Sequence, residues 1–100
     1  MIGLVYIDDD LVGEVDLSIT DGSMGAIGGE LRALERYSKY RQSIQKECER
    51  RGIANSMNFN FRISINGEII KPEGGIGITD VAGFEPYVEL AGLDLNSISF

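Results

Sequence analysis

The stretch FNFRISINGEII, residues 59–70, does most to decide the fold. Apolar residues alternate with polar ones from Phe59 to Ile65, a period of two that is typical of a strand with one buried face. The dipeptide Asn66-Gly67 is the strongest short signal for a two-residue hairpin turn. We therefore predict a β-hairpin over residues 57–71, with Glu68 to Ile70 as its returning strand.

A second hairpin is predicted over residues 2–19, where another apolar run is interrupted by three aspartates. Aspartate tolerates positive φ angles, so Asp9-Asp10 is placed at the turn. This register predicts a core face made of Ile2, Leu4, Tyr6, Val15, Leu17 and Ile19. It leaves a half-apolar, half-acidic opposite face that carries Val5, Ile7 and Val12 beside Glu14, Asp16 and Ser18.

A helix is predicted over residues 31–51. An apolar stripe follows the 3.6-residue period of a helix. It consists of Ala33, Tyr37, Tyr40, Ile44 and Cys48. Arg50 and Arg51 suit the negative end of the helix dipole, and Gly52 suits a left-handed cap.

Glycine-rich turns surround the remaining predicted strands. Met24 to Leu31 is expected to add a strand whose glycines allow a neighbour to approach closely, and Ile76 to Thr79 another. Residues 87–93 are expected to form a strand, with a short helix as the alternative. The fold class is therefore α+β. A mostly antiparallel sheet, built from two hairpins plus short strands, carries one amphipathic helix within a single domain, residues 1–100.

Much catalytic chemistry is excluded because the chain contains no histidine and one cysteine, Cys48. No Ser-His-Asp triad, Cys-His dyad or histidine-based metal site can form. The run Asp8 to Asp10 lacks the spacing of an EF-hand loop, and the glycines of residues 22–29 lack the P-loop lysine. We therefore expect no enzyme activity, no cofactor and no metal.

Charge is distributed unevenly: the net charge is −7, yet seven of the nine basic residues lie in residues 32–51. On a helix, five of them would fall within about an 80° arc. This predicted ridge comprises Arg32, Arg36, Lys39, Lys46 and Arg50. It is interpreted either as a face whose cations neutralise the acidic sheet of the same molecule or as a second contact surface for an acidic partner or a nucleic-acid backbone.

The acidic hairpin is the first candidate contact surface, because charge beside apolar side chains favours fast protein association. Acids that protect an exposed sheet edge from aggregation are the alternative. The predicted partner-binding residues are Asp8, Asp9, Asp10, Glu14 and Asp16 with Val5, Ile7 and Val12. These acids predict a partner with a basic surface.

The predicted function is non-catalytic protein binding, in the form of a small acidic bacterial inhibitor or immunity-type protein that neutralises a nuclease-like toxin. The alternative is a phage or secretion-system assembly subunit that self-associates through the N-terminal hairpin. A pI near 4.4 disfavours nucleic acid and anionic membranes as partners. The single cysteine and the lack of a signal sequence favour the cytoplasm, and the oligomeric state is left open.

Overall fold

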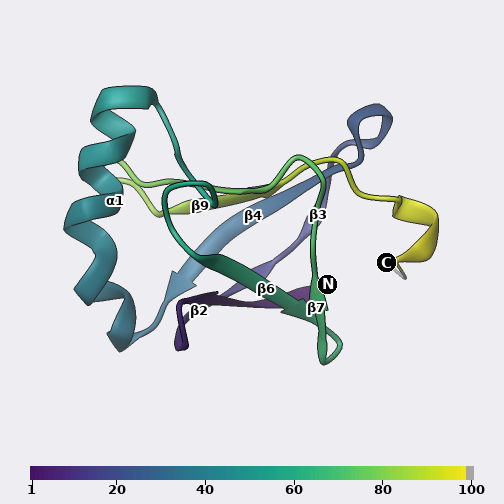
Figure 1. Ribbon diagram of the computed structural model, residues 1–100, viewed down its shortest axis with the longest axis horizontal. Helices are drawn as coiled ribbons and strands as arrows, with labels where there is room; N and C mark the ends of the chain where they lie inside the picture. Colours follow the sequence, from purple (N-terminus) through teal and green to yellow (C-terminus); the bar gives the residue numbers. More distant parts are fainter. Residues whose placement is uncertain (99–100) are drawn as a thin grey trace.

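The computed structural model describes residues 1–98 and has the predicted α+β architecture, in which a curled antiparallel sheet packs against one α-helix (Figure 1). The strands are β1 (Ile2–Ile7), β2 (Asp10–Asp16), β3 (Ser18–Asp21), β4 (Ala26–Ala33), β5 (Ala54–Asn55), β6 (Phe61–Ile65), β7 (Glu68–Ile70), β8 (Ile76–Thr79) and β9 (Tyr87–Leu90). The helix is α1 (Ser38–Arg51), and three 3-10 turns are η1 (Gly22–Met24), η2 (Glu35–Tyr37) and η3 (Leu95–Ser97).

The strand order is β5-β8-β9-β4-β2-β1-β6-β7, with β3 paired to β4 beside this path. The pairs are all antiparallel. Several neighbours are far apart in the chain, since β1 pairs with β6 and β4 pairs with β9. Figure 1 shows α1 standing beside one end of the sheet, where it contacts β5 and β8. This arrangement leaves the opposite, outer face of β1, β2 and β6 uncovered by the helix.

The central hairpin is confirmed. Asn66 and Gly67 both have positive φ angles, 54° and 82°, as a type I′ turn requires. They join β6 to β7 in the register Ile65↔Glu68 and Ile63↔Ile70. Phe61, Ile63 and Ile65 are buried as the alternation predicted, although Ser64 between them is buried too.

The N-terminal hairpin forms, but its predicted register is wrong, by two residues next to the turn and by one residue from Val5 back to Ile2. The turn consists of Asp8 and Asp9, and Ile7 pairs with Asp10. A one-residue slip exchanges the two faces of a strand. Gly3, Val5 and Ile7 therefore face the core. The side chains of Ile2, Leu4 and Tyr6 point outward.

The returning segment of this hairpin keeps two of its three predicted core residues and gains another. Val15 and Leu17 are buried as predicted, whereas Ile19 is half-exposed. A bulge between Val5 and Tyr6 shifts the pairing, and Val12 is buried as well. A bulge re-aims side chains locally, which strict alternation along the sequence cannot anticipate.

The strand predicted near residues 24–31 is confirmed as β4 and extends to Ala33. Its glycines do allow close approach: a Cβ atom on Gly29 would collide with the carbonyl oxygen of Asp16 on the neighbouring strand. The prediction that the helix begins at residue 31 is wrong, because Leu31 and Arg32 pair with β2. Helical structure begins only at η2 and continues directly into α1.

The C-terminal strands and the helix stripe agree with the sequence. Residues 76–79 and 87–90 are β8 and β9, so the helical alternative for the latter is wrong. Tyr37, Ile44 and Cys48 are buried, whereas Ala33 lies on β4 and is exposed. Gly52 has a φ of 84° and donates to the carbonyl of Cys48, which confirms the left-handed cap.

Candidate functional site at the N-terminal hairpin

The turn of the hairpin is held by Arg62 of β6. Asp8 has a φ of 53°, and its carbonyl oxygen accepts a hydrogen bond from Nη2 of Arg62. The same nitrogen lies 3.3 Å from Oδ1 of Asp9, whose side chain is fully exposed. Arg62 also lies over the ring of Tyr6, 6.0 Å from its centroid. One cation thus links the two aspartates of the turn to the adjacent strand.

Asp10 is the most heavily paired acid of the hairpin. Its carboxylate accepts hydrogen bonds from Nη1 of Arg36 at 2.9 Å, from Nζ of Lys39 at 3.3 Å and from the hydroxyl of Tyr40. The side chain is only 17% exposed. The hydrogen bond from Tyr40 and those from the two cations lower the pKa of Asp10 to about 2. Asp10 therefore joins the hairpin to the start of the helix.

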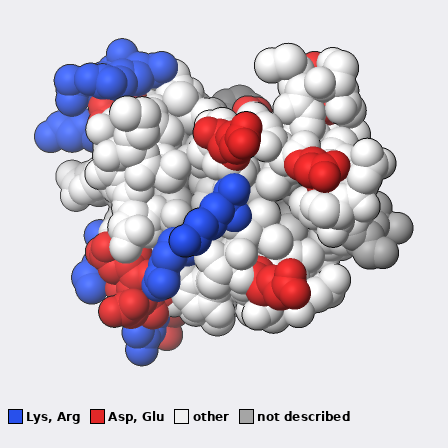
Figure 2. All heavy atoms as spheres, turned by 45° about the vertical axis from the view of Figure 1, so that its right-hand side comes forward, with Lys and Arg blue, Asp and Glu red and all other residues white. Residues whose placement is uncertain are grey.

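The two acids of β2 are also paired. Oε2 of Glu14 lies 2.9 Å from Nη2 of Arg32, which stands opposite it on β4. Oδ1 of Asp16 lies 2.9 Å from the N-terminal ammonium of Met1, which lowers the pKa of this carboxyl. The hairpin acids thus lie among cations of the same molecule, which favours the interpretation of internal neutralisation. Figure 2 shows acidic and basic side chains lying against one another at the lower left of its view.

The apolar residues predicted for this contact surface are not at the surface. Val5, Ile7 and Val12 are almost completely buried in the core. The assignment of Val5 and Ile7 was wrong because the register places the odd residues of β1 inward. Val12 was misplaced because it falls at the bulge, between the paired residues Leu11 and Gly13 of β2. The outer face instead carries Ile2, Leu4 and Tyr6, and the acids of β2 remain beside them: Ile2 pairs with Asp16 and Leu4 with Glu14.

The predicted basic ridge is divided between several elements. Arg32 belongs to β4, so its assignment to the helix was wrong. Arg36 lies in η2 and, like Lys39, is engaged by Asp10. Arg50 lies 3.5 Å from Glu47 on the same helix, and Lys46 has no ion-pair partner within residues 1–98. This distribution does not leave one continuous row of available cations.

A buried polar cluster beneath the helix was missed by the sequence analysis. Asp80, which is 2% exposed, accepts hydrogen bonds from the hydroxyl of Tyr37 at 2.7 Å and from Nε2 of Gln45 at 3.1 Å. Nε of Arg41 lies 3.6 Å away. Burial and the Asp80 carboxylate raise the pKa of Tyr37 well above its usual range. The position of Tyr37 on the apolar stripe was visible, but nothing marked Asp80 as its partner.

This cluster joins the helix to the loop after β8. The backbone N–H of Asp80 donates to Sγ of Cys48, whose thiol donates to the carbonyl of Ile78, each at 3.4 Å. The polar groups therefore satisfy one another within the protein. Such a network stabilises one packing of the helix rather than presenting a reactive group. Cys48 is buried, as its place on the stripe predicted.

Comparison with family models, curated proteins and solved structures finds no significant match. Within residues 1–98, no group of three or more acidic or cysteine side chains is arranged to hold a metal ion. The helix of this part of the chain is neither long nor apolar enough to cross a membrane. The candidate site is thus defined by its geometry alone.

Proposed function

We propose that this protein is a non-catalytic protein-binding module that contacts its partner through the outer face of β1. We define this β1 outer face as Ile2, Leu4 and Tyr6 with Glu14 and Asp16 of β2. The proposal rests on one observation. Three partly exposed apolar side chains of β1 point outward, beside two acids of β2. An apolar centre with a charged rim is typical of protein–protein interfaces.

The expected partner has a basic surface. A net charge of −7 attracts cationic proteins over distances comparable to the Debye length. Since Asp10 and the neighbouring acids are internally paired, the attraction arises from the whole molecule more than from the hairpin. In its concrete form, the protein is a small bacterial inhibitor of the immunity type that covers a nuclease-like toxin in the cytoplasm. The free thiol of Cys48 suits such a reducing compartment.

Self-association is the second candidate, as expected of a phage or secretion-system assembly subunit. The observation in its favour is that Ile2 is 47% exposed on the uncovered outer face of the sheet. Two copies could bury this face in an isologous contact. Sedimentation at increasing protein concentration distinguishes the candidates, because a monomer at all concentrations favours the inhibitor and a closed oligomer favours assembly.

The test uses the double variant Ile2→Ser/Leu4→Ser and the control Ile19→Ser, which replaces a similarly exposed isoleucine on β3. Wild type and both variants are immobilised and used to capture proteins from a bacterial lysate. We expect a basic protein that binds wild type and the control but not the double variant, with an association rate that falls as salt is added. Equal capture by the double variant would refute this contact face. A rate that does not depend on salt would refute the basic partner.

A further inference from the structure

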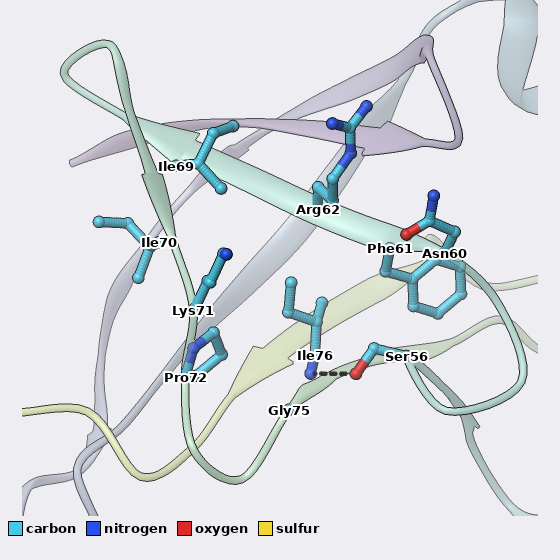
Figure 3. Close-up of a pocket in the computed structure, with 10 residues that line it drawn as sticks. All are labelled: Ser56, Asn60, Phe61, Arg62, Ile69, Ile70, Lys71, Pro72, Gly75 and Ile76. Atoms are coloured by element: carbon cyan, nitrogen blue, oxygen red, sulfur yellow. Dashed lines mark hydrogen bonds between the residues drawn. The ribbon is translucent and has the colours of Figure 1, made fainter.

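A cleft of about 360 Å³ lies between the two ends of the curled sheet, outside the surfaces discussed above. Figure 3 shows β6 and the residues after β7 on one side of it, and Ser56 with the beginning of β8 on the other. The hydroxyl of Ser56 accepts a hydrogen bond from the N–H of Ile76 at 3.2 Å. This volume lies within the range of small-ligand sites.

The cleft is lined by basic residues of the second half of the chain. Arg62 and Lys71 are the only basic residues after position 51, and both line the cleft. Lys71 has no ion-pair partner within residues 1–98, although the chain contains 16 acids. Nε of Arg62 is buried and lacks a hydrogen-bond acceptor there. Lys71 is therefore the available cation at this opening, because the guanidinium of Arg62 is held by the hairpin turn.

The rest of the lining is mainly apolar. Phe61 and Ile76 are each 4% exposed and form its inner part. Ile70, at the end of β7, and Pro72 after it line one side, and Ile69 is half-exposed at the rim. In Figure 3 the Lys71 side chain extends toward β6, while Ile76 points into the space from the opposite side. The site thus combines a cationic rim with an apolar interior.

We propose that this cleft binds a small amphipathic carboxylate, with its hydrocarbon tail against Ile76 and its anionic head at Lys71. An unpaired lysine next to apolar walls attracts a carboxylate, and burial of the tail contributes in proportion to its apolar area. Arg62 adds positive potential but is largely occupied by the hairpin turn. Arg62 also contacts Tyr6 of the β1 outer face. The carboxylate is nevertheless placed at Lys71, so this proposal does not depend on the proposed function.

The test titrates decanoate into the full-length protein and follows binding by calorimetry and by the methyl NMR signals of isoleucine. We expect shifts at Ile70 and Ile76, and decanol, which has the same tail without the charge, should bind about tenfold more weakly. The variant Lys71→Met should also lower decanoate affinity about tenfold. The control Lys46→Met removes another lysine without an ion pair, on α1, and should leave the affinity unchanged.

Four results would overturn this proposal. Equal affinity for decanol and decanoate, or for wild type and Lys71→Met, would exclude recognition of the carboxylate. Shifts confined to isoleucines outside the cleft would exclude the location. Association of the ligand-free protein that protects the Ile70 and Ile76 methyls would show that a second copy fills the cleft. The Ile2→Ser/Leu4→Ser variant should bind decanoate like wild type, which separates this test from that of the contact face.

Discussion

The hydroxyl of Tyr37 donates a 2.7 Å hydrogen bond to the carboxylate of Asp80, and both side chains are buried where the helix meets the sheet. The bond joins residues that are 43 positions apart in the chain. It positions the first turn of the helical segment against the loop that follows β8. Helix placement therefore depends on a polar contact as well as on the apolar stripe.

Removal of the Tyr37 hydroxyl is expected to destabilise the protein. In Tyr37→Phe the buried carboxylate of Asp80 loses a donor, which should lower the free energy of unfolding by about 1–3 kcal/mol. Urea denaturation followed by circular dichroism measures the change. The control Tyr87→Phe removes a hydroxyl from the outer side of β9 and should change stability by less than about 0.5 kcal/mol. Equal losses in both variants would contradict the role of the Asp80 contact.

The register of the N-terminal hairpin can be tested with two identical substitutions. Ile7 is buried and Ile2 is half-exposed on the same strand. Ile7→Ala should cost about 2–5 kcal/mol because it leaves a cavity, whereas Ile2→Ala should cost less than about 1 kcal/mol. Thermal and urea unfolding of the two variants give the comparison. The reverse order would support the register predicted from the sequence.

Stability is expected to fall in acid partly because of Asp10. Its folded pKa of about 2 lies below the ordinary value of 3.8 for an aspartate, so the native state favours the ionised form. The resulting stabilisation is present above pH 4 and is lost as the pH falls through about 2. Asp10→Asn should therefore weaken the dependence of stability on pH in this window. Asp16, whose pKa is also lowered, should preserve part of it.

Denaturant unfolding at a series of pH values between neutrality and pH 2 measures this dependence. Glu49→Gln on α1 is a suitable control, because Glu49 forms no ion pair within residues 1–98. Its pH profile should parallel that of wild type. An Asp10→Asn profile that also parallels wild type would show that the contacts with Arg36, Lys39 and Tyr40 do not contribute to stability.

Two glycines should respond differently to the same substitution. Gly52 has a positive φ but open space around its Cα, so Gly52→Ala should cost about 1–2 kcal/mol through backbone strain alone. Gly29 has no room for a Cβ against the Asp16 carbonyl, so Gly29→Ala forces the strands apart. We expect a cost above about 2 kcal/mol. Unfolding free energies that are equal for both variants would contradict the close approach at Gly29.

Local sequence patterns were sufficient to predict much of the fold. The Asn66-Gly67 turn and the alternation before it specified the central hairpin, and Gly52 marked the end of the helix. The start of the helix was misplaced because residues 31–33 are compatible with both a helix and a strand. They form a strand because they pair with β2 and continue the part of β4 that pairs with β9.

The candidate site was predictable only in part. The sequence showed that acids and apolar residues would share the N-terminal hairpin, but it assigned the wrong apolar set to the surface. It also showed an excess of cations in residues 32–51 without showing that Arg36 and Lys39 would meet Asp10. No local sequence pattern predicted the cleft lined by Arg62 and Lys71, because this cleft forms between opposite ends of the sheet.

By itself, the sequence determined the α+β class, the positions of most strands and turns, and the chemistry that a chain without histidine cannot perform. Tertiary structure decided which face of β1 is buried, which acids are neutralised and that Arg62 and Lys71 line one cleft. The physical reason is that these effects act over different separations along the chain. Turn preferences and periodicity act over a few residues, whereas register, ion pairing and burial depend on segments that meet only when the sheet curls.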